Sequence, residues 1–277
     1  MSSTTSSPTS PSPSAPLRTY ATVSLHKSDT IRLLNFPPDT TSALEPVILA
    51  CWPPGLDSQS KFHQSYEYKL KGTPFGYYRS QQHVGGIRLL RSVLVFLYER
   101  NWELVTSALC GRRYTAKDTL IFRQARAAES PLPPVEWLVL APMSTDKLRV
   151  VYDADGVRLS GGDAERNHDH LGVLITAIKK TLEGLDYFDK GEWSHDSFEF
   201  ELKGRPWRSR GEASVKMRIL LMQLLDTIEG YGWRLYTTVL QRTSTDEDRI
   251  LDTWYFVRER GDVTKVDVDV AVKGLES

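Results

Sequence analysis

The sequence has few cysteines, no excess of either charge and no long apolar run. Cys51 and Cys110 lie far apart in the chain and form neither a disulfide framework nor a Cys-x-x-Cys pair. The 35 basic residues balance the 35 acidic ones, so no whole-molecule field draws the chain to nucleic acid or to anionic lipid. No apolar run approaches the ~18 residues that a membrane span requires. We therefore expect a soluble protein of a reducing compartment, cytoplasmic or nuclear, with no membrane partner.

The sequence also lacks the short motifs that accompany common catalytic sites. It contains no Gly-x-Ser-x-Gly elbow, no Walker phosphate loop and no Gly-x-Gly-x-x-Gly after a strand. A pairing of Cys110 with His83 or His63 has no support in a single sequence. Because active sites need not carry a short motif, an enzyme is the less favoured class rather than an excluded one, and no cofactor is expected.

A group of histidines and acids offers nitrogen and oxygen atoms of the kind that metals bind. It comprises Asp163, Glu165, His168, Asp169, His170, His195 and Asp196. Acids in such a stretch equally cap helices, and no helical His-x-x-x-His or Cys pair accompanies them. Metal binding is therefore a minor alternative, and no metal site is predicted.

The first 28 residues are nearly all Ser, Thr, Pro and Ala, a composition that buries too little apolar surface to offset chain entropy. We expect this tail to be disordered, and its three Ser-Pro pairs are potential phosphorylation sites. A mitochondrial presequence is the alternative, because no acid precedes Asp29. Only Arg18 and Lys27 are basic, however, and such presequences are rich in arginine.

The rest of the chain contains one pattern twice, in residues 66–123 and 198–258. Each copy begins with alternating aromatic residues that end in Lys-Gly, continues with Pro and an aromatic residue, and then has an apolar helical run that stops before a tryptophan. The matching segments are Tyr66–Gly72 with Phe198–Gly204, Pro74-Phe75 with Pro206-Trp207, and Trp102-Glu103-Leu104 with Trp233-Arg234-Leu235. This agreement predicts a tandem duplication.

The helical runs predict long amphipathic helices over residues 84–101 and 212–229. When the tryptophans that follow them are superposed, the apolar positions of the two helices coincide, and Val215 joins the stripe of the second helix. The second helix ends at Gly230-Tyr231-Gly232, where glycine takes a left-handed conformation without steric cost. The predicted core residues are the two tryptophans and a phenylalanine from each closing strand: Trp102, Trp233, Phe122 and Phe256.

The start of the strand after each helix resembles that of small uncharacterised bacterial β-α-β-β domains, which carry Gly-Trp-Glu-Leu there. Trp102-Glu103-Leu104 matches this signature without the glycine, and Gly232-Trp233-Arg234-Leu235 departs from it at Arg234. The resemblance covers about 60 residues of each copy. It implies a topology for the core of each copy and carries no activity.

Shorter helices are expected upstream of each pattern, at residues 42–52 and 170–185, and a last strand at 266–272. The predicted fold is α+β, a tandem duplication of a β-α-β-α-β-β unit in mainly antiparallel sheets with helices on one face. The units are residues 29–128 and 135–277, separated by a Pro-rich linker at 129–134. We expect them to pack around a pseudo-twofold axis, and leave open whether their sheets merge.

Two functions remain in competition. A duplicated α+β module without catalytic motifs fits a protein-interaction or scaffold role, built as an intramolecular pseudo-dimer with an unknown protein partner. The alternative is a nucleic acid or phosphorylated ligand, bound by a basic-aromatic loop at a helix N-terminus. Its candidate residues are Lys203, Arg205, Trp207, Arg208, Arg210 and Lys216. A solvated loop whose aromatic residues lie on the core is the favoured interpretation of the same residues.

Overall fold

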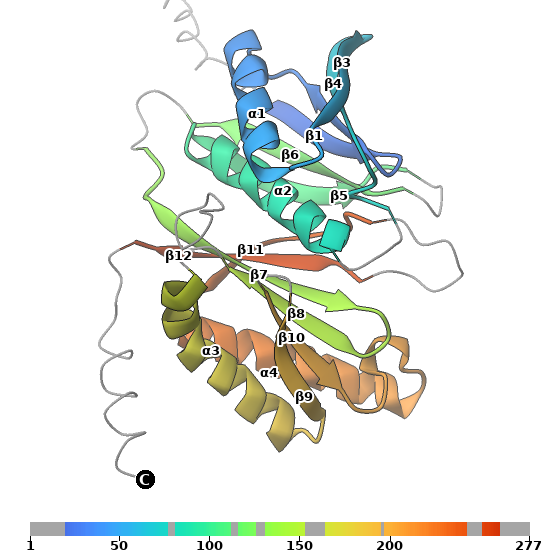
Figure 1. The fold of residues 1–277 in the computed structure, drawn as a ribbon, viewed down its shortest axis with the longest axis vertical. Helices are drawn as coiled ribbons and strands as arrows, with labels where there is room; N and C mark the ends of the chain where they lie inside the picture. Colours follow the sequence, from blue (N-terminus) through green and yellow to red (C-terminus); the bar gives the residue numbers. More distant parts are fainter. Residues whose placement is uncertain are drawn as a thin grey trace, which may run out of the picture.

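The computed structural model describes residues 20–76, 81–111, 116–125, 131–152, 164–194, 197–242 and 251–260, with only the backbone at 81 and 164–170. These residues form two six-stranded antiparallel sheets and four α-helices (Figure 1). The α+β class is therefore confirmed, and the two sheets are separate. The strand predicted at 266–272 lies outside the described residues.

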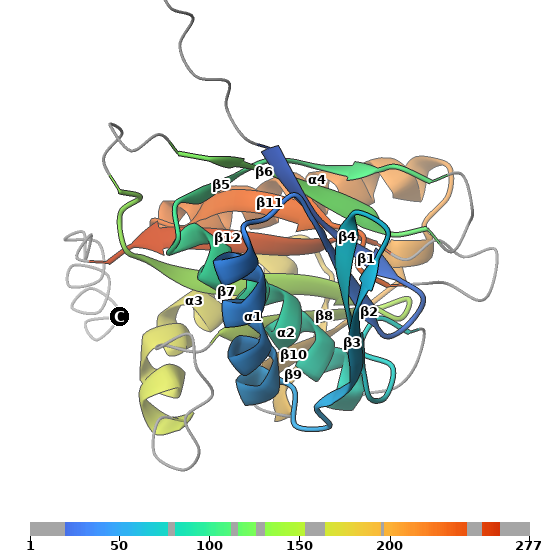
Figure 2. The same cartoon turned by 90° about the horizontal axis from the view of Figure 1, so that it is seen from above.

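The first unit has the element order β-β-α-β-β-α-β-β. Its elements are β1 (Tyr20–His26), β2 (Thr30–Leu34), α1 (Pro38–Cys51), β3 (Leu56–Phe62), β4 (Ser65–Leu70), α2 (Gln81–Tyr98), β5 (Trp102–Leu109) and β6 (Asp118–Gln124). Its strands form sheet A in the order β3-β4-β2-β1-β6-β5. The helices α1 and α2 lie side by side (Figure 2).

The second unit repeats this order, with one added 3-10 turn. Its elements are β7 (Val135–Met143), β8 (Lys147–Tyr152), α3 (Ala164–Gly184), β9 (Phe188–Ser194), β10 (Ser197–Leu202), η1 (Pro206–Arg208), α4 (Glu212–Gly230), β11 (Arg234–Val239) and β12 (Thr253–Glu259). Its strands form sheet B, and the order β9-β10-β8-β7-β12-β11 corresponds strand for strand to sheet A.

The strand registers confirm the duplication residue by residue. In sheet A the pairing of β5 with β6 shifts between Leu104 and Thr106, and in sheet B the pairing of β11 with β12 shifts between Leu235 and Thr237. The pairings of β3 with β4 and of β9 with β10 also shift at matching places. A bulge adds one residue to one strand and bends it, so repeated bulges reflect a repeated design.

Each unit contains strands that the sequence analysis does not predict. β1 lies inside the segment expected to be disordered, so ordered structure begins by Tyr20 and not at residue 29. β3 and β9 lie in stretches without a strand prediction, and residues 56–65 are expected to be a polar loop. Both are sheet-edge strands whose residues are almost all exposed. An edge strand with two wet faces has no apolar alternation, which is the signal that predicts strands.

The tryptophans after α2 and α4 lie in matching surroundings. Trp102 and Trp233 are 1% and 3% exposed, and the phenylalanines Phe122 and Phe256 are fully buried. The residue before each tryptophan, Asn101 or Gly232, has a positive φ of 59° or 80°. That left-handed step turns the chain under the helix end, and Asn and Gly tolerate it best.

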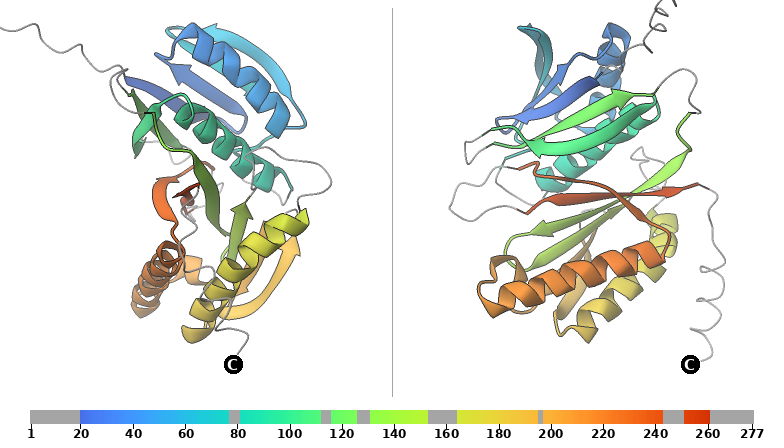
Figure 3. Two further views of the ribbon diagram at one scale, coloured as in Figure 1. Left: turned by 90° about the vertical axis from the view of Figure 1, so that its left-hand side faces the viewer. Right: turned by 180° about the vertical axis from the view of Figure 1, so that it is seen from behind.

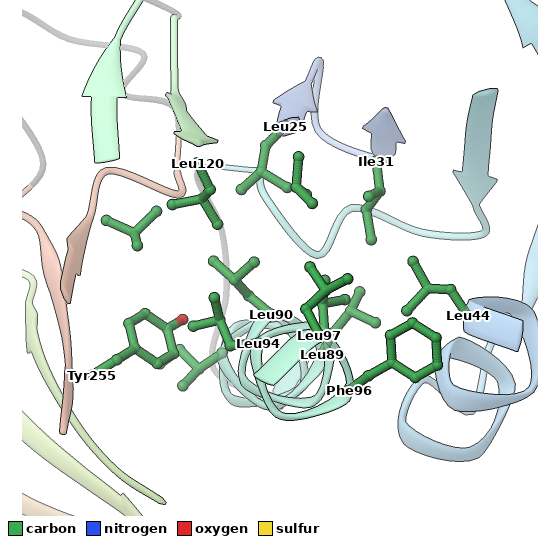
Figure 4. Close-up of a cluster of buried hydrophobic side chains, with 14 of the residues drawn as sticks. Leu25, Ile31, Leu44, Leu89, Leu90, Leu94, Phe96, Leu97, Leu120 and Tyr255 are labelled. Atoms are coloured by element: carbon green, nitrogen blue, oxygen red, sulfur yellow. The ribbon is translucent and has the colours of Figure 1, made fainter. Parts of the chain in front are cut away.

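The two units stack in layers, with α2 enclosed between the sheets (Figure 3). One face of α2 packs on sheet A, while Trp137, Val139 and Tyr255 of sheet B belong to the same core cluster as α2. Figure 4 shows Tyr255 of sheet B beside this helix, and Leu25, Ile31 and Leu120 of sheet A above it. The opposite face of sheet B packs on α3 and α4 in a second cluster.

This stacking corrects the expected pseudo-twofold arrangement. A twofold axis would place α4 on sheet A wherever α2 lies on sheet B, because a twofold interface uses the same surface of both units. Instead α2 alone is enclosed, and the outer side of α4 is exposed. The units are therefore joined head to tail, helix face to sheet face.

Candidate functional site

The outer face of α4 carries an exposed apolar stripe. Val215, Ile219 and Met222 are 56%, 38% and 57% exposed, at the four- and three-residue spacing that places them on one side of a helix. Leu220, Leu224 and Ile228 point the other way, into the core. The prediction that Val215 belongs to the buried stripe is therefore wrong.

The equivalent face of α2 has the opposite chemistry and the opposite burial. Superposing Trp102 on Trp233 places Val84, Arg88 and Arg91 at the positions of the stripe, and these residues are 1%, 6% and 1% exposed. Two arginines are thus buried where the second unit exposes Ile219 and Met222. The second unit thus exposes an apolar stripe on a surface that is covered in the first unit, and exposed apolar patches are typical of interaction sites.

Charges of opposite sign flank the two ends of the stripe. Near its N-terminal end, Lys216 pairs with Glu212 at 3.5 Å, and Arg218 donates to the carbonyl oxygen of Ser214 at 2.7 Å. Toward the C-terminal end, Asp226 is exposed. The stripe is therefore bordered by Lys216, Arg218 and Glu212 in its N-terminal half and by Asp226 beyond its C-terminal end.

The predicted basic-aromatic loop lies directly before α4, around η1. Lys203 pairs with Asp186 at 2.8 Å, and this hydrogen bond raises the pKa of the lysine. Arg205 has a left-handed backbone with a φ of 50°. The exposed cations of this region lie before α4 or in its first turns, on the helix that carries the apolar stripe: Lys203, Arg205, Arg208, Arg210 and Lys216.

Trp207 has a structural role in this loop. Its indole N–H donates to the carbonyl oxygen of Lys147 at 2.8 Å, and its ring packs against the second core cluster. Its backbone N–H donates to the carbonyl of Thr145 at 3.1 Å, as that of Phe75 donates to Ser28 at 2.9 Å in the first unit. In both units, the aromatic residue after the proline thus connects this loop by a backbone hydrogen bond to the turn of the unit's first hairpin.

Charged groups are buried where α2 meets sheet B. Glu199 pairs with both Arg149 and Lys147, and Arg149 is only 3% exposed. Burial alone would raise the pKa of Glu199, but the two cations outweigh it and hold that pKa below its usual value. Tyr255 donates to the side-chain oxygen of Gln241 on the same face.

His83, at the start of α2, lies among these cations. Burial lowers its pKa well below the usual value, and Arg242 and Arg149 lower it further. Neither ring nitrogen has a hydrogen-bond partner among the described residues. The imidazole is therefore neutral and acts as a packing group at this interface.

The outer face of sheet A carries the counterpart of the buried ion pair. Arg32 and Glu67 are cross-strand neighbours in β2 and β4, as Arg149 and Glu199 are in β8 and β10. The Arg32–Glu67 pair is formed as well, but none of the described helices covers it, and its side chains are 26% and 19% exposed. The face that α2 covers on sheet B is thus open on sheet A.

Two groups with perturbed pKa values are held inside the first unit. Burial lowers the pKa of Lys117 to about 8, and its amine donates to the carbonyl of Lys27. Burial raises the pKa of the half-buried Cys51 thiol to about 11, which keeps it protonated. Burial accounts for both shifts.

The minor alternatives find no new support in the part of the chain that the structure describes. No cluster of three or more potential metal ligands occurs there, and the side chains of His168, His170 and His195 lie outside it. Among the described helices, none combines the length and the apolar character needed to cross a bilayer.

A family model for an uncharacterised domain matches the chain twice, over residues 19–123 and 136–257. The chain belongs to this family. Each match spans one structural unit, so each unit is one copy of the family's domain. No curated protein and no solved structure matches the chain significantly. Membership therefore accounts for the duplicated architecture and assigns no chemistry to it.

The stripe on α4 is the feature that sequence reasoning misses. Ile219 and Met222 lie outside the apolar face that the second helix shares with the first. Their position is the feature of the sequence that could have indicated a second apolar surface. A helix with apolar residues on two opposite sides needs two surfaces to cover it.

Proposed function

We propose that this protein is a non-catalytic protein-interaction module whose partner docks on the outer face of α4. The observation that supports it is the stripe of Val215, Ile219 and Met222, exposed at positions that a sheet covers in the first unit. That internal precedent also indicates the kind of partner. The face of α2 receives the open side of an antiparallel sheet, so the partner of α4 presents a sheet face too.

The size of the stripe predicts a reversible complex. Full burial of side chains such as these is worth ~1.5–3 kcal/mol each, and about half of their surface is already covered. Association also loses several kcal/mol of rotational and translational freedom. The cations near the start of α4 add steering toward an acidic rim more than they add affinity.

A photo-crosslinking residue placed at Met222 tests this proposal, with the same residue at Leu49 as control. Leu49 lies on α1 and is 49% exposed, so it is an apolar helix position away from the stripe. Crosslinking in cells at Met222 and not at Leu49 identifies a partner, which is then purified and titrated against the protein. The Ile219→Glu/Met222→Glu variant should weaken its binding at least tenfold, and Leu49→Glu should leave binding unchanged. Equal crosslinking at both positions, none at either, or tight binding by the double variant contradicts the proposal.

The exposed arginines before α4 favour an anionic ligand as a second candidate. Arg205, Arg208 and Arg210 surround a helix N-terminus, where unpaired N–H groups favour anions. The engaged indole of Trp207 argues against base stacking, which leaves charge as the attraction. Binding to heparin should then fall steeply with salt and disappear in Arg208→Glu/Arg210→Glu. Retention that does not change with salt counts against this candidate.

A further inference from the structure

The two open ends of the layered stack correspond to the two surfaces that meet at its centre. At the centre, the outer face of α2 covers one face of sheet B. In the repeat, the outer face of α4 corresponds to the outer face of α2. The open face of sheet A corresponds to the face of sheet B that α2 covers. Each molecule therefore exposes both halves of an interface that it already forms internally.

The strand registers establish the equivalence of the two sheet faces. Thr22 pairs with Ile121 across β1 and β6, as Val139 pairs with Tyr255 across β7 and β12. Ser24 pairs with Arg32, as Ala141 pairs with Arg149. The matched positions are Tyr20 with Trp137, Thr22 with Val139, Ser24 with Ala141, Arg32 with Arg149, Ile121 with Tyr255 and Arg123 with Val257.

The open face of sheet A can accept a helix without losing its own ion pairs. Arg32 pairs with Glu67 and Arg123 pairs with Glu103, so covering this face leaves neither carboxylate without a cation. Ser24 is as small as its counterpart Ala141 and allows a helix backbone to come equally close.

Two changes between the internal interface and the open surfaces favour the pairing of those surfaces. On the helix side, Val95 of α2 is replaced by the exposed Asp226 of α4. On the sheet side, Val257 of sheet B is replaced by Arg123 of sheet A. Two valines at the internal interface thus become an acid on the open helix and, on the open sheet, the cation of the Arg123–Glu103 pair, which an approaching Asp226 can share.

We infer that copies of this chain associate head to tail, with α4 of one molecule on the open face of sheet A of the next. This inference rests on the proposed function and names a second copy of the chain as the partner. Because the two surfaces differ, the association is heterologous, and it grows into rings or open chains rather than stopping at a symmetric dimer. The polar residues Thr22 and Ser24 make it weaker than the internal interface, so it depends on protein concentration.

Sedimentation velocity of the full chain and two blocked variants tests the inference. The helix-blocked variant is Ile219→Glu/Met222→Glu, and the sheet-blocked variant is Ile121→Glu, with Thr22→Glu as a second form should the first not fold. The wild-type mass should rise with concentration, and each blocked variant alone should stay monomeric. An equimolar mixture of the two should form a complex of two chains and stop there, which doubles the mass. Leu49→Glu should assemble like the wild type.

Three results overturn the inference. The first is a wild-type protein that stays monomeric at all concentrations. If the Met222 crosslink still captures a verified partner in that case, the proposed function stands although the self-association does not. A sheet-blocked variant that dimerises alone shows symmetric pairing through α4. A mixture of the blocked variants that stays monomeric shows that the two surfaces do not bind each other.

Discussion

At the scale of single residues, the two tryptophans after the long helices are among the largest buried side chains of their units. Phe36 packs edge-on to Trp102 at 4.7 Å between ring centroids, and Tyr152 packs on Trp233 at 5.9 Å. Arg258 also lies over the Trp233 ring at 4.6 Å. Each indole closes the end of a core cluster beneath its helix.

Trp233→Ala should lower the free energy of unfolding by ~3–5 kcal/mol, because it leaves a large cavity in a packed core. That loss corresponds to a fall in melting temperature on the order of 10 °C in a protein of this size. Trp193→Ala is the matched control, since its indole is 39% exposed and should cost much less. Equal losses in the two variants, measured by urea unfolding, would show that Trp233 is not a core residue.

His83 predicts an acid-sensitive interface. Its folded pKa lies well below 6.5, so below that pH the unfolded chain binds a proton that the folded chain does not. This difference lowers the stability by up to about 1.4 kcal/mol between pH 7.5 and 5.5. The free energy of unfolding, measured with urea at both pH values, should therefore fall less between pH 7.5 and 5.5 in His83→Leu than in the wild type. His26, whose pKa is also lowered, is present in both proteins and cancels. Parallel pH dependence of the two proteins would refute the prediction.

At the scale of elements, one cross-strand ion pair occurs in two environments. Glu199 lies with Arg149 and Lys147 beneath α2, whereas Glu67 lies with Arg32 on the open face of sheet A. Removing one partner of a buried pair strands the other charge, which costs ~3–5 kcal/mol. A fully solvated pair contributes about 0–1 kcal/mol, and the Arg32–Glu67 pair, whose side chains are 26% and 19% exposed, lies between these limits.

Glu199→Gln should therefore destabilise the protein by several kcal/mol, while Glu67→Gln should cost distinctly less, because its pair is more exposed. Both variants remove one charge from the same position of the repeat, so each controls for the other in urea unfolding. A similar small effect of both would show that α2 does not seal the pair from water. A large effect of Glu67→Gln alone would point to an additional cover on sheet A.

The same scale explains which elements can be predicted from the sequence. The long helices and the strands after them are predicted because their apolar positions repeat with the period of the element. The edge strands β3 and β9 are missed because almost every residue in them faces water. β1 does alternate, with Ala21, Val23 and Leu25 buried, but a Ser/Thr-rich tail precedes it and masks the signal.

At the scale of the whole molecule, the packing of the two units follows from differences between the copies that sequence similarity hides. The duplication can be predicted from the residues that the two copies share at the ends of their elements. These shared residues are compatible with both a twofold and a head-to-tail arrangement, so they do not distinguish the two. The residues that decide between them are those that differ, such as Val139 and Ala141 on the covered sheet against Thr22 and Ser24 on the open one. The exposed stripe on α4 also consists of residues that differ between the copies. It can therefore be recognised as a candidate site only from the way the two units stack.

Since α2 covers sheet B, the second unit should not be stable alone. Separating the chain between residues 125 and 131 and expressing residues 131–277 would expose Trp137, Val139 and Tyr255, which are 0–4% exposed in the whole molecule. An apolar sheet face of this kind promotes aggregation. The isolated second unit should therefore be insoluble or bind a hydrophobic dye strongly.

Coexpression with residues 1–125 should restore a soluble one-to-one complex, because the interface between the units is intact in the split protein. Glu199→Gln in the second fragment should weaken that complex, since it leaves Arg149 beneath α2 without a carboxylate. Size-exclusion chromatography with mass detection distinguishes the outcomes. A second unit that is monomeric and cooperatively folded by itself would show that the sheet face tolerates water, and that the enclosure of α2 contributes little to the fold.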